Sequence, residues 1–214
     1  MPDLSHPAIQ RVIEVARRKG VELQITVFEE STHTAEEAAA TVGADLAQIV
    51  KSLVFVTPEP SGTLTPIICL VSGRNRVDIA RLAAILGEPS VRRATAREAR
   101  DLTGFSIGGI APIGHQRSVR IVMDPDLGRF PVVWAAAGTD TAVFPVAPAT
   151  LLLLANATVA PIVEDSWLDD RREEVAKASA SAPLLRTVTN DGAFAVSDGG
   201  GTGESGDDRP RAGA

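Results

Sequence analysis

Cysteine and aromatic residues are scarce in this sequence. Its 214 residues include one cysteine and no tyrosine, with six phenylalanines and two tryptophans. The single cysteine, Cys69, cannot form an internal disulfide, and in the apolar run "TPIICLVSG" it is typical of a small buried side chain. These scarcities predict a protein of the reducing cytoplasm, with a core built mainly from valine, isoleucine, leucine and alanine.

Membrane-spanning runs and metal-binding motifs are also missing. No apolar run approaches the roughly 20 residues that span a bilayer, and the start "MPDLSHPAIQ" lacks the basic and apolar regions of a signal peptide. One cysteine and three widely spaced histidines give no ligand spacing such as CxxC or HExxH. We therefore expect a soluble, cytoplasmic protein with no membrane partner, no metal and no cofactor.

The sequence also has no excess of positive charge, since its net charge is −6. Nucleic-acid affinity that does not depend on sequence comes largely from lysine and arginine, so this charge argues against a generic polyanion-binding protein, and we expect no DNA partner. The Gly- and acid-rich stretch 197–214 has almost nothing to bury, and we predict a disordered tail there. Before the tail, "SWLDDRREEVAKASA" predicts a terminal helix and extension within residues 166–196.

Residues 1–165 carry the patterns of one folded domain. Apolar residues at helical spacing and two capping boxes, Thr34 to Glu37 and Thr95 to Glu98, predict helices, while short β-branched runs predict strands. Because the predicted helices and strands follow one another without strict βαβ alternation, the sequence indicates an α/β domain around a mixed sheet. Helices are expected at 5–20, 32–43, 78–86, 95–104 and 148–156, and strands at 22–28, 48–56, 66–73, 90–94, 118–124 and 131–138.

The stretch "GFSIGGIAPIGH", residues 104–115, packs four glycines and a proline into one loop. Gly108 and Gly109 permit backbone conformations closed to other residues and let a ligand approach the main chain, and Pro112 stiffens the turn. Such a loop can aim backbone N–H groups at an oxyanion or a phosphate. A plain connection between a helix end and a strand also explains the glycines, and glycine content alone favours that interpretation.

Lys51 stands inside the apolar strand pattern 48–56, where an ammonium must find a partner or reach solvent. Two interpretations stay open: a lysine that reaches solvent at a sheet edge, and an ammonium held in a pocket to bind a phosphate or a carbonyl. His115 is a candidate base, RNA contact or structural histidine, and the last two are favoured. His6 and His33 are expected at helix starts or on the surface. A hydrolase with a Ser-His-Asp triad stays an alternative, although no GxSxG elbow is present.

Four segments in collinear order resemble the YbaK family of aminoacyl-tRNA deacylases, also called the prolyl-tRNA editing-domain family. They are "HTAEEAAATVGADLAQIVKSLVF", "LVSGRNRVDIARLAAILG", "VRRATAREARDLTGFSIGGIAPIGH" and "VWAAAGTDTAVF". The resemblance runs from about His33 to Ile162. Its most specific pieces are Lys51 within "IVKSL" and the GxxPxxH pattern that Gly109, Pro112 and His115 make.

The resemblance implies an α/β domain with a mixed, partly barrel-like sheet flanked by helices. It also implies trans-editing, the hydrolysis of the ester that joins a wrong amino acid to tRNA, which is needed where one binding pocket discriminates poorly between small side chains. In such a site Lys51 would anchor the substrate near the 3′-terminal adenosine, and N–H groups around Gly108 and Gly109 would stabilise the developing oxyanion. A ribose hydroxyl of the tRNA, and no protein base, would assist the attacking water.

The resemblance leaves the substrate pocket and the partners to be identified. Pro112 and His115 would shape the loop or contact RNA, and Gly138 and Thr139 would shape the amino-acid pocket, because this chain has "AAGTDTAVF" where some family members carry a "GGxRG"-like turn. Cysteinyl- or alanyl-tRNA for proline is the expected substrate, and a synthetase is an expected partner that delivers tRNA to a monomer of negative charge. The alternative is a non-catalytic module of the same fold that binds the tRNA 3′ end, a synthetase or a small ligand.

Overall fold

The structure is a computed structural model that describes residues 4–32 and 34–164. The elements expected within 166–196 and 197–214, and His33, lie outside the described residues. The helices are α1 (Pro7–Arg18), α2 (Ala35–Val42), α3 (Ile79–Leu86), α4 (Ala96–Thr103) and α5 (Pro148–Ala155), with 3₁₀ turns η1 (Leu46–Gln48) and η2 (Pro125–Arg129). The strands are β1 (Thr26–Val27), β2 (Ile49–Pro58), β3 (Leu64–Ser72), β4 (Arg92–Arg93), β5 (Arg120–Met123), β6 (Val133–Ala136), β7 (Ala142–Val146) and β8 (Thr158–Val159).

Within the described residues the strands form one eight-stranded mixed sheet, in the order β1-β7-β6-β2-β3-β5-β8, with β4 paired to β2. The long β2–β3 hairpin is its centre, and Lys51 lies opposite Val71 in it. β2 also runs parallel to β6 near Ile49 and antiparallel to β4 near Phe55. The expected fold class, an α/β domain with a mixed sheet flanked by helices, is confirmed.

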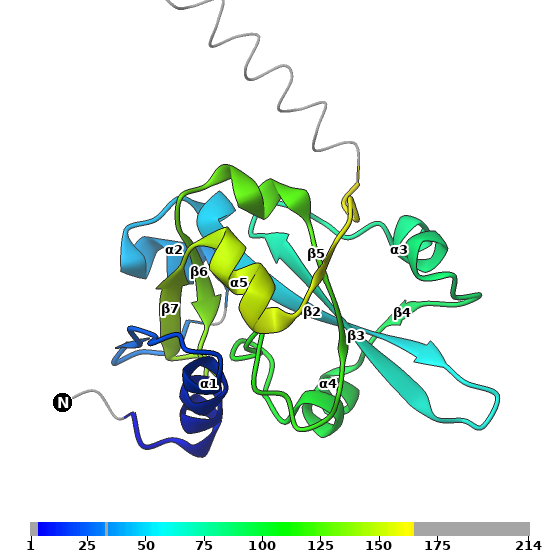
Figure 1. Ribbon diagram of the computed structural model, residues 1–214, viewed down its shortest axis with the longest axis horizontal. Coiled ribbons are helices and arrows are strands. Elements are labelled where there is room, and N and C mark those ends of the chain that lie inside the picture. Colours follow the sequence, from blue (N-terminus) through cyan, green and yellow to red (C-terminus); the bar gives the residue numbers. More distant parts are fainter. Residues whose placement is uncertain (1–3, 33, 165–214) are drawn as a thin grey trace, which may run out of the picture. The chain divides into compact units, whose positions relative to one another are not determined.

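Both faces of the central hairpin are buried. On one face Ile68 and Leu70 of β3 pack with residues of α1 and α5, and on the other face Cys69 and Val71 pack with Leu82 of α3. Figure 1 shows α1 and α3 on opposite sides of the hairpin. This double burial explains why β3 reads as a continuous apolar run, since alternation appears only where one face meets water. Burial also raises the pKa of the Cys69 thiol to about 12, so the thiol stays protonated.

The helix predictions hold, whereas the strands are predicted less well. Both capping boxes are present, and the side chain of His6 caps α1 by accepting the N–H of Ala8 at 3.2 Å. The alternation at 22–28 correctly marks alternate burial, but only Thr26–Val27 finds a partner strand. The expected strand 90–94 shrinks to Arg92–Arg93. None of the helices in the described ranges has the length and apolarity needed to cross a bilayer.

Two strands, β7 and β8, escape prediction from the sequence. β7 contains Pro145, which lacks a backbone N–H and disfavours a central strand. The structure tolerates it because β1 reaches only Val143 and Ala142, so no strand on that side needs the missing donor. β8 has two residues, which is too short for a period-2 pattern.

Candidate functional site

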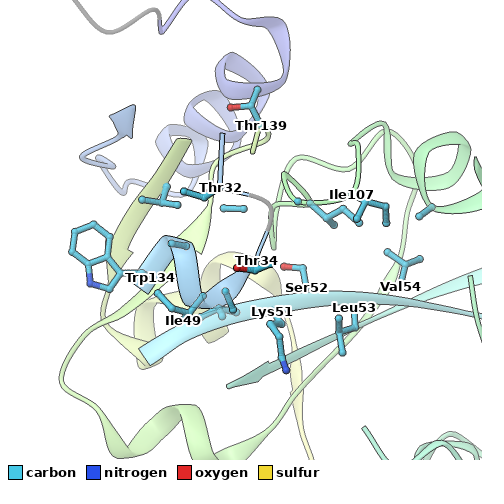
Figure 2. Close-up of a pocket in the computed structure, with 18 of the residues that line it drawn as sticks. Thr32, Thr34, Ile49, Lys51, Ser52, Leu53, Val54, Ile107, Trp134 and Thr139 are labelled. Carbon is cyan, nitrogen blue, oxygen red and sulfur yellow. The ribbon is translucent and has the colours of Figure 1, made fainter. Parts of the chain in front are cut away.

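A cavity of about 230 Å³ opens where β2, the start of α2 and the loop after α4 meet. More than half of its lining residues are alanine, valine or isoleucine, and they come from the sheet, from α2, and from α4 with its flanking loops. Figure 2 shows Thr32, Thr34, Ser52 and Thr139 with Ile107 around this space. The polar side chains among the described lining residues are Thr32, Thr34, Lys51, Ser52, Arg93 and Thr139.

One wall of the cavity begins at Thr34, the first residue of the predicted capping box. Its Oγ1 accepts the N–H of Glu37 at 3.1 Å, and the Glu37 carboxylate accepts the N–H of Thr34 at 3.3 Å. Two residues earlier, Thr32 donates both its backbone N–H and its hydroxyl to the carbonyl oxygen of Asp140, at 2.8 and 2.9 Å. These bonds join the start of α2 to the turn at 137–141, which forms another part of the wall.

Lys51 enters the cavity lining from β2, but its side chain leaves the strand on the face opposite Ser52. Successive strand residues point to opposite faces. Figure 2 shows Lys51 and Leu53 on one side of β2 and Ser52 and Val54 on the other. The Lys51 Nζ donates to the backbone carbonyl of Asn75 at 2.6 Å, so the half-buried ammonium has a protein partner.

The charges near Lys51 are mostly positive. Burial is the main cause that lowers the pKa of Lys51 below its usual 10.5; the carboxylate of Glu36 opposes this, and the guanidinium groups of Arg76 and Arg93 add to it. Arg93 also lines the cavity. Positive charges therefore outnumber negative ones among the groups that influence Lys51, and such an imbalance favours an anionic ligand.

Ser52 is a cavity residue that the sequence reasoning missed. Its Oγ is buried and has no hydrogen-bond partner among the described residues. Burying a hydroxyl without a partner costs roughly 1–3 kcal/mol, so a ligand group that bonds to it would remove this cost. The available signal was a second polar residue directly after Lys51 in an apolar strand.

Gly108 and Gly109 lie in the turn after α4, and their surroundings differ. Gly108 lines the cavity with φ +89°, a left-handed conformation that favours glycine, and within the described residues its N–H donates no hydrogen bond. The Gly109 N–H donates to the carbonyl of Ser106 at 3.0 Å. A Cβ on Gly109 would lie 2.5 Å from the Thr139 Cα, so this glycine is required by backbone packing.

Pro112 and His115 lie outside the cavity lining. Pro112 is buried, and the His115 Nε2–H donates to the carbonyl of Ala111 at 2.9 Å, which fixes the ring tautomer. The ring meets Phe105 edge-on, with centroids 5.8 Å apart. Burial is the largest cause that lowers the pKa of His115, to about 4, so the imidazole is neutral at physiological pH. This geometry agrees with the loop-shaping role that the sequence favours over a base.

Gly138 and Thr139 occupy the turn between β6 and β7. Thr139 lines the cavity and shares a hydrogen bond with Thr141, with hydroxyl oxygens 3.1 Å apart. Gly138 does not line it; its φ is +106°, and a Cβ there would lie 2.8 Å from the backbone of Ala8 in α1. Thr139 therefore faces the site, and Gly138 lets a helix pack against the turn.

Within the described part of the chain, no three His, Cys, Asp or Glu side chains gather in a way that could hold a metal ion.

The predicted site residues separate into two groups, those that line the cavity and those that do not. The lining includes Lys51, Gly108 and Thr139; the residues outside it, which pack loops or helices, are Gly109, Pro112, His115 and Gly138.

The fold and the cavity together define an α/β domain with a small, mostly apolar cavity whose lining includes Lys51 and Arg93. The family model for the aminoacyl-tRNA editing domain matches residues 29–154. The chain belongs to this family.

Three similar proteins agree with this assignment. A crystal structure described as "a putative trans-editing enzyme for prolyl tRNA synthetase" is 43% identical, with a TM-score of 0.67, and covers 74% of this chain and 98% of its own. "Putative Cys-tRNA(Pro)/Cys-tRNA(Cys) deacylase EbsC" of Enterococcus faecalis is 25% identical over 60% of this chain and 76% of its own length. A proline–tRNA ligase of Limosilactobacillus fermentum is 32% identical over 44% of this chain, but over only 17% of the ligase.

Proposed function

We propose that this protein is a trans-editing aminoacyl-tRNA deacylase, which hydrolyses the ester of a misacylated tRNA, with cysteinyl- or alanyl-tRNA for proline as the substrate. The observation that carries the proposal is the cavity of about 230 Å³ in a chain of the editing-domain family. This volume lies below the roughly 300–1,000 Å³ of pockets for drug-sized ligands. It suits a small aminoacyl group, while the remainder of the tRNA stays outside.

The cavity offers one group that ester hydrolysis needs, a backbone N–H for the developing oxyanion. Water attacks the ester carbonyl carbon, the carbonyl oxygen becomes an oxyanion, and the bond to the ribose oxygen breaks, leaving a free amino acid and a tRNA hydroxyl. Gly108 lines the cavity and its N–H donates no hydrogen bond within the described residues, so we assign this N–H to the oxyanion; the Gly109 N–H is already bonded to the Ser106 carbonyl within its turn. The oxyanion role expected for both glycines is therefore proposed for Gly108 alone.

The proton of the attacking water needs an acceptor. Among the described lining residues there is no carboxylate and no imidazole. His115 lies outside the lining, and its pKa of about 4 makes it a weak base. In this proposal a ribose hydroxyl of the bound tRNA assists the attacking water, as the resemblance to the YbaK family implies. Lys51 and Arg93 supply positive charge for the tRNA phosphates, which lie at the mouth of the cavity in this proposal.

A deacylation assay on a panel of mischarged tRNAs tests the proposal. Cysteine, alanine and serine, each attached to the tRNA for proline, are incubated with the protein, and release of each amino acid is followed against a blank without protein. Fast release of cysteine or alanine is the expected result. No release from any tRNA, together with measurable tRNA binding, would reject the deacylase and favour the non-catalytic module.

Ser52→Ala should slow deacylation by about tenfold without loss of stability. In this proposal the Ser52 hydroxyl bonds to the substrate, and one such hydrogen bond is worth about 1.4 kcal/mol, a factor of ten in rate. The folded protein loses no internal hydrogen bond, because this Oγ has no partner among the described residues. The measurements are kcat/KM on the best tRNA of the panel and the Tm. Ser118→Ala, at an exposed serine outside the lining, is the control; equal rates for both variants would remove Ser52 from the site.

A further inference from the structure

Helix α1 ends at Arg18, before the residues that the family model matches, yet it contacts both loops of the site. Ala8, Ile9, Val12 and Ala16 bury one face of α1 in the main core. The helix is therefore fixed to the sheet. Anything that α1 holds is fixed to the sheet as well.

Arg11 joins α1 to the two ends of the 104–115 loop. Its guanidinium donates to the carbonyl of Gly104 at 2.8 Å and to the carbonyl of Gly114 at 3.4 Å. The same group lies over the Phe105 ring, 4.9 Å from its centroid. A planar, always charged guanidinium can make these contacts at once, and a lysine ammonium cannot.

The backbone of α1 also meets both loops at glycines. A Cβ on Gly114 would come within 3.3 Å of the backbone of Arg11 and Val12, and a Cβ on Gly138 within 2.8 Å of the backbone of Ala8. Two cavity residues depend on these loops: Gly108 lies inside the first, and Thr139 follows Gly138 in the second. The loops also touch each other, because Gly109 packs on the backbone of Thr139.

We propose that α1 is a clamp that fixes the 104–115 loop and the 137–141 turn in their reactive arrangement, with Arg11 as its positioning residue. Core packing alone would fasten the helix to the sheet, but it would not account for a guanidinium bonded to carbonyls at both ends of one loop. Arg11 does not line the cavity and touches no substrate in this arrangement. It acts through the position of Gly108 and its N–H. The kinetic part of the proposal depends on the proposed deacylase function.

Arg11→Met tests the clamp, because methionine keeps the length and helix propensity of the side chain but has no guanidinium. We expect kcat to fall by about tenfold with KM within twofold, since small misplacements of reacting groups lower rates steeply. Arg11→Lys should recover part of the loss, because an ammonium reaches one of the two carbonyls. Arg18→Met is the matched control: it removes a guanidinium from the same helix, where Arg18 pairs with Glu14 on the surface at 2.9 Å and with no other described residue.

Two NMR measurements separate a clamp from a general effect on the fold. Amide exchange should become faster in 104–115 and 137–141 in Arg11→Met and stay unchanged in Arg18→Met. The pKa of His115 should rise from about 4 in Arg11→Met only, because the nearby Arg11 charge is among the causes that lower it. Unchanged kcat with faster exchange, or an equal loss of kcat in Arg18→Met, would overturn the positioning role. If the native protein deacylates nothing, the exchange result alone decides: unchanged exchange in Arg11→Met rejects the clamp, and faster exchange in both loops supports it.

Discussion

Gly109→Ala should destabilise the protein by about 3 kcal/mol, while Gly128→Ala should change its stability by less than about 0.5 kcal/mol. An alanine Cβ at position 109 would lie 2.5, 2.6 and 2.8 Å from the Cα, C and N atoms of Thr139. All three are backbone atoms, so no side-chain rotation relieves the clash. Either the loop or the β6–β7 turn must move, and both are held by other contacts.

Gly128 is a close control for this substitution. A Cβ there would meet nothing within 4 Å, and neither Gly109 nor Gly128 has a positive φ. Both backbones therefore accept alanine, and the two variants differ in packing space alone. Thermal unfolding measures the difference: for a protein of this size, about 3 kcal/mol corresponds to a fall in Tm of roughly 6–12 °C. Equal Tm values would mean that the loop and the turn separate freely, and would contradict the tight packing on which the clamp depends.

The glycine loop illustrates what the sequence could predict and what it could not. Its position after α4 follows from the sequence pattern, whereas its expected role in the site came from the resemblance to the YbaK family. The reason for Gly109 does not, because the neighbour that excludes a side chain there is Thr139, 30 positions away in the chain. Glycine content indicates that a close approach occurs, whereas only the fold identifies the approaching group as backbone.

Local patterns were reliable wherever their cause was local. Each capping box involves residues three positions apart, and both are present in the structure. The partner of Lys51 is different, since the Asn75 carbonyl comes from the segment after β3 and depends on the β2–β3 register. The choice between a lysine in a pocket and one at a sheet edge required that register. Ser52 was missed for the same reason, because an unpartnered hydroxyl is defined by its surroundings.

Lys51→Met should lower kcat/KM for deacylation by about a hundredfold and change stability by no more than about 1 kcal/mol. Hydrogen bonds to charged groups are worth about 1.5–3 kcal/mol, which sets the size of the loss if the ammonium holds a substrate phosphate. Stability has two opposing contributions. The variant loses the 2.6 Å bond to Asn75, but it also removes an ammonium that burial disfavours.

The pH dependence of stability tests this balance. The pKa of Lys51 in the folded protein lies below its usual 10.5, mainly because of burial, so the folded state binds the proton less well than the unfolded state. Protonation therefore destabilises the native protein below the folded pKa, and this destabilisation disappears as the pH rises through that value towards 10.5. The Tm of the native protein, relative to Lys51→Met, should rise over that range. Deacylation by the native protein, corrected for the spontaneous rate, should fall over it as the ammonium loses its charge.

Arg74→Met is the control that separates the role of Lys51 from a general loss of positive charge. Arg74 precedes Asn75 in the chain and pairs with Asp45 on the surface at 3.0 Å, so its loss changes the net charge equally but leaves the cavity intact. We expect its kcat/KM to stay within twofold of the native value. If Lys51→Met keeps full activity, the ammonium does not hold the substrate, and its bond to Asn75 is purely structural. If both variants lose activity alike, the cations act through the overall field of the protein, and the anchoring role assigned to Lys51 is wrong.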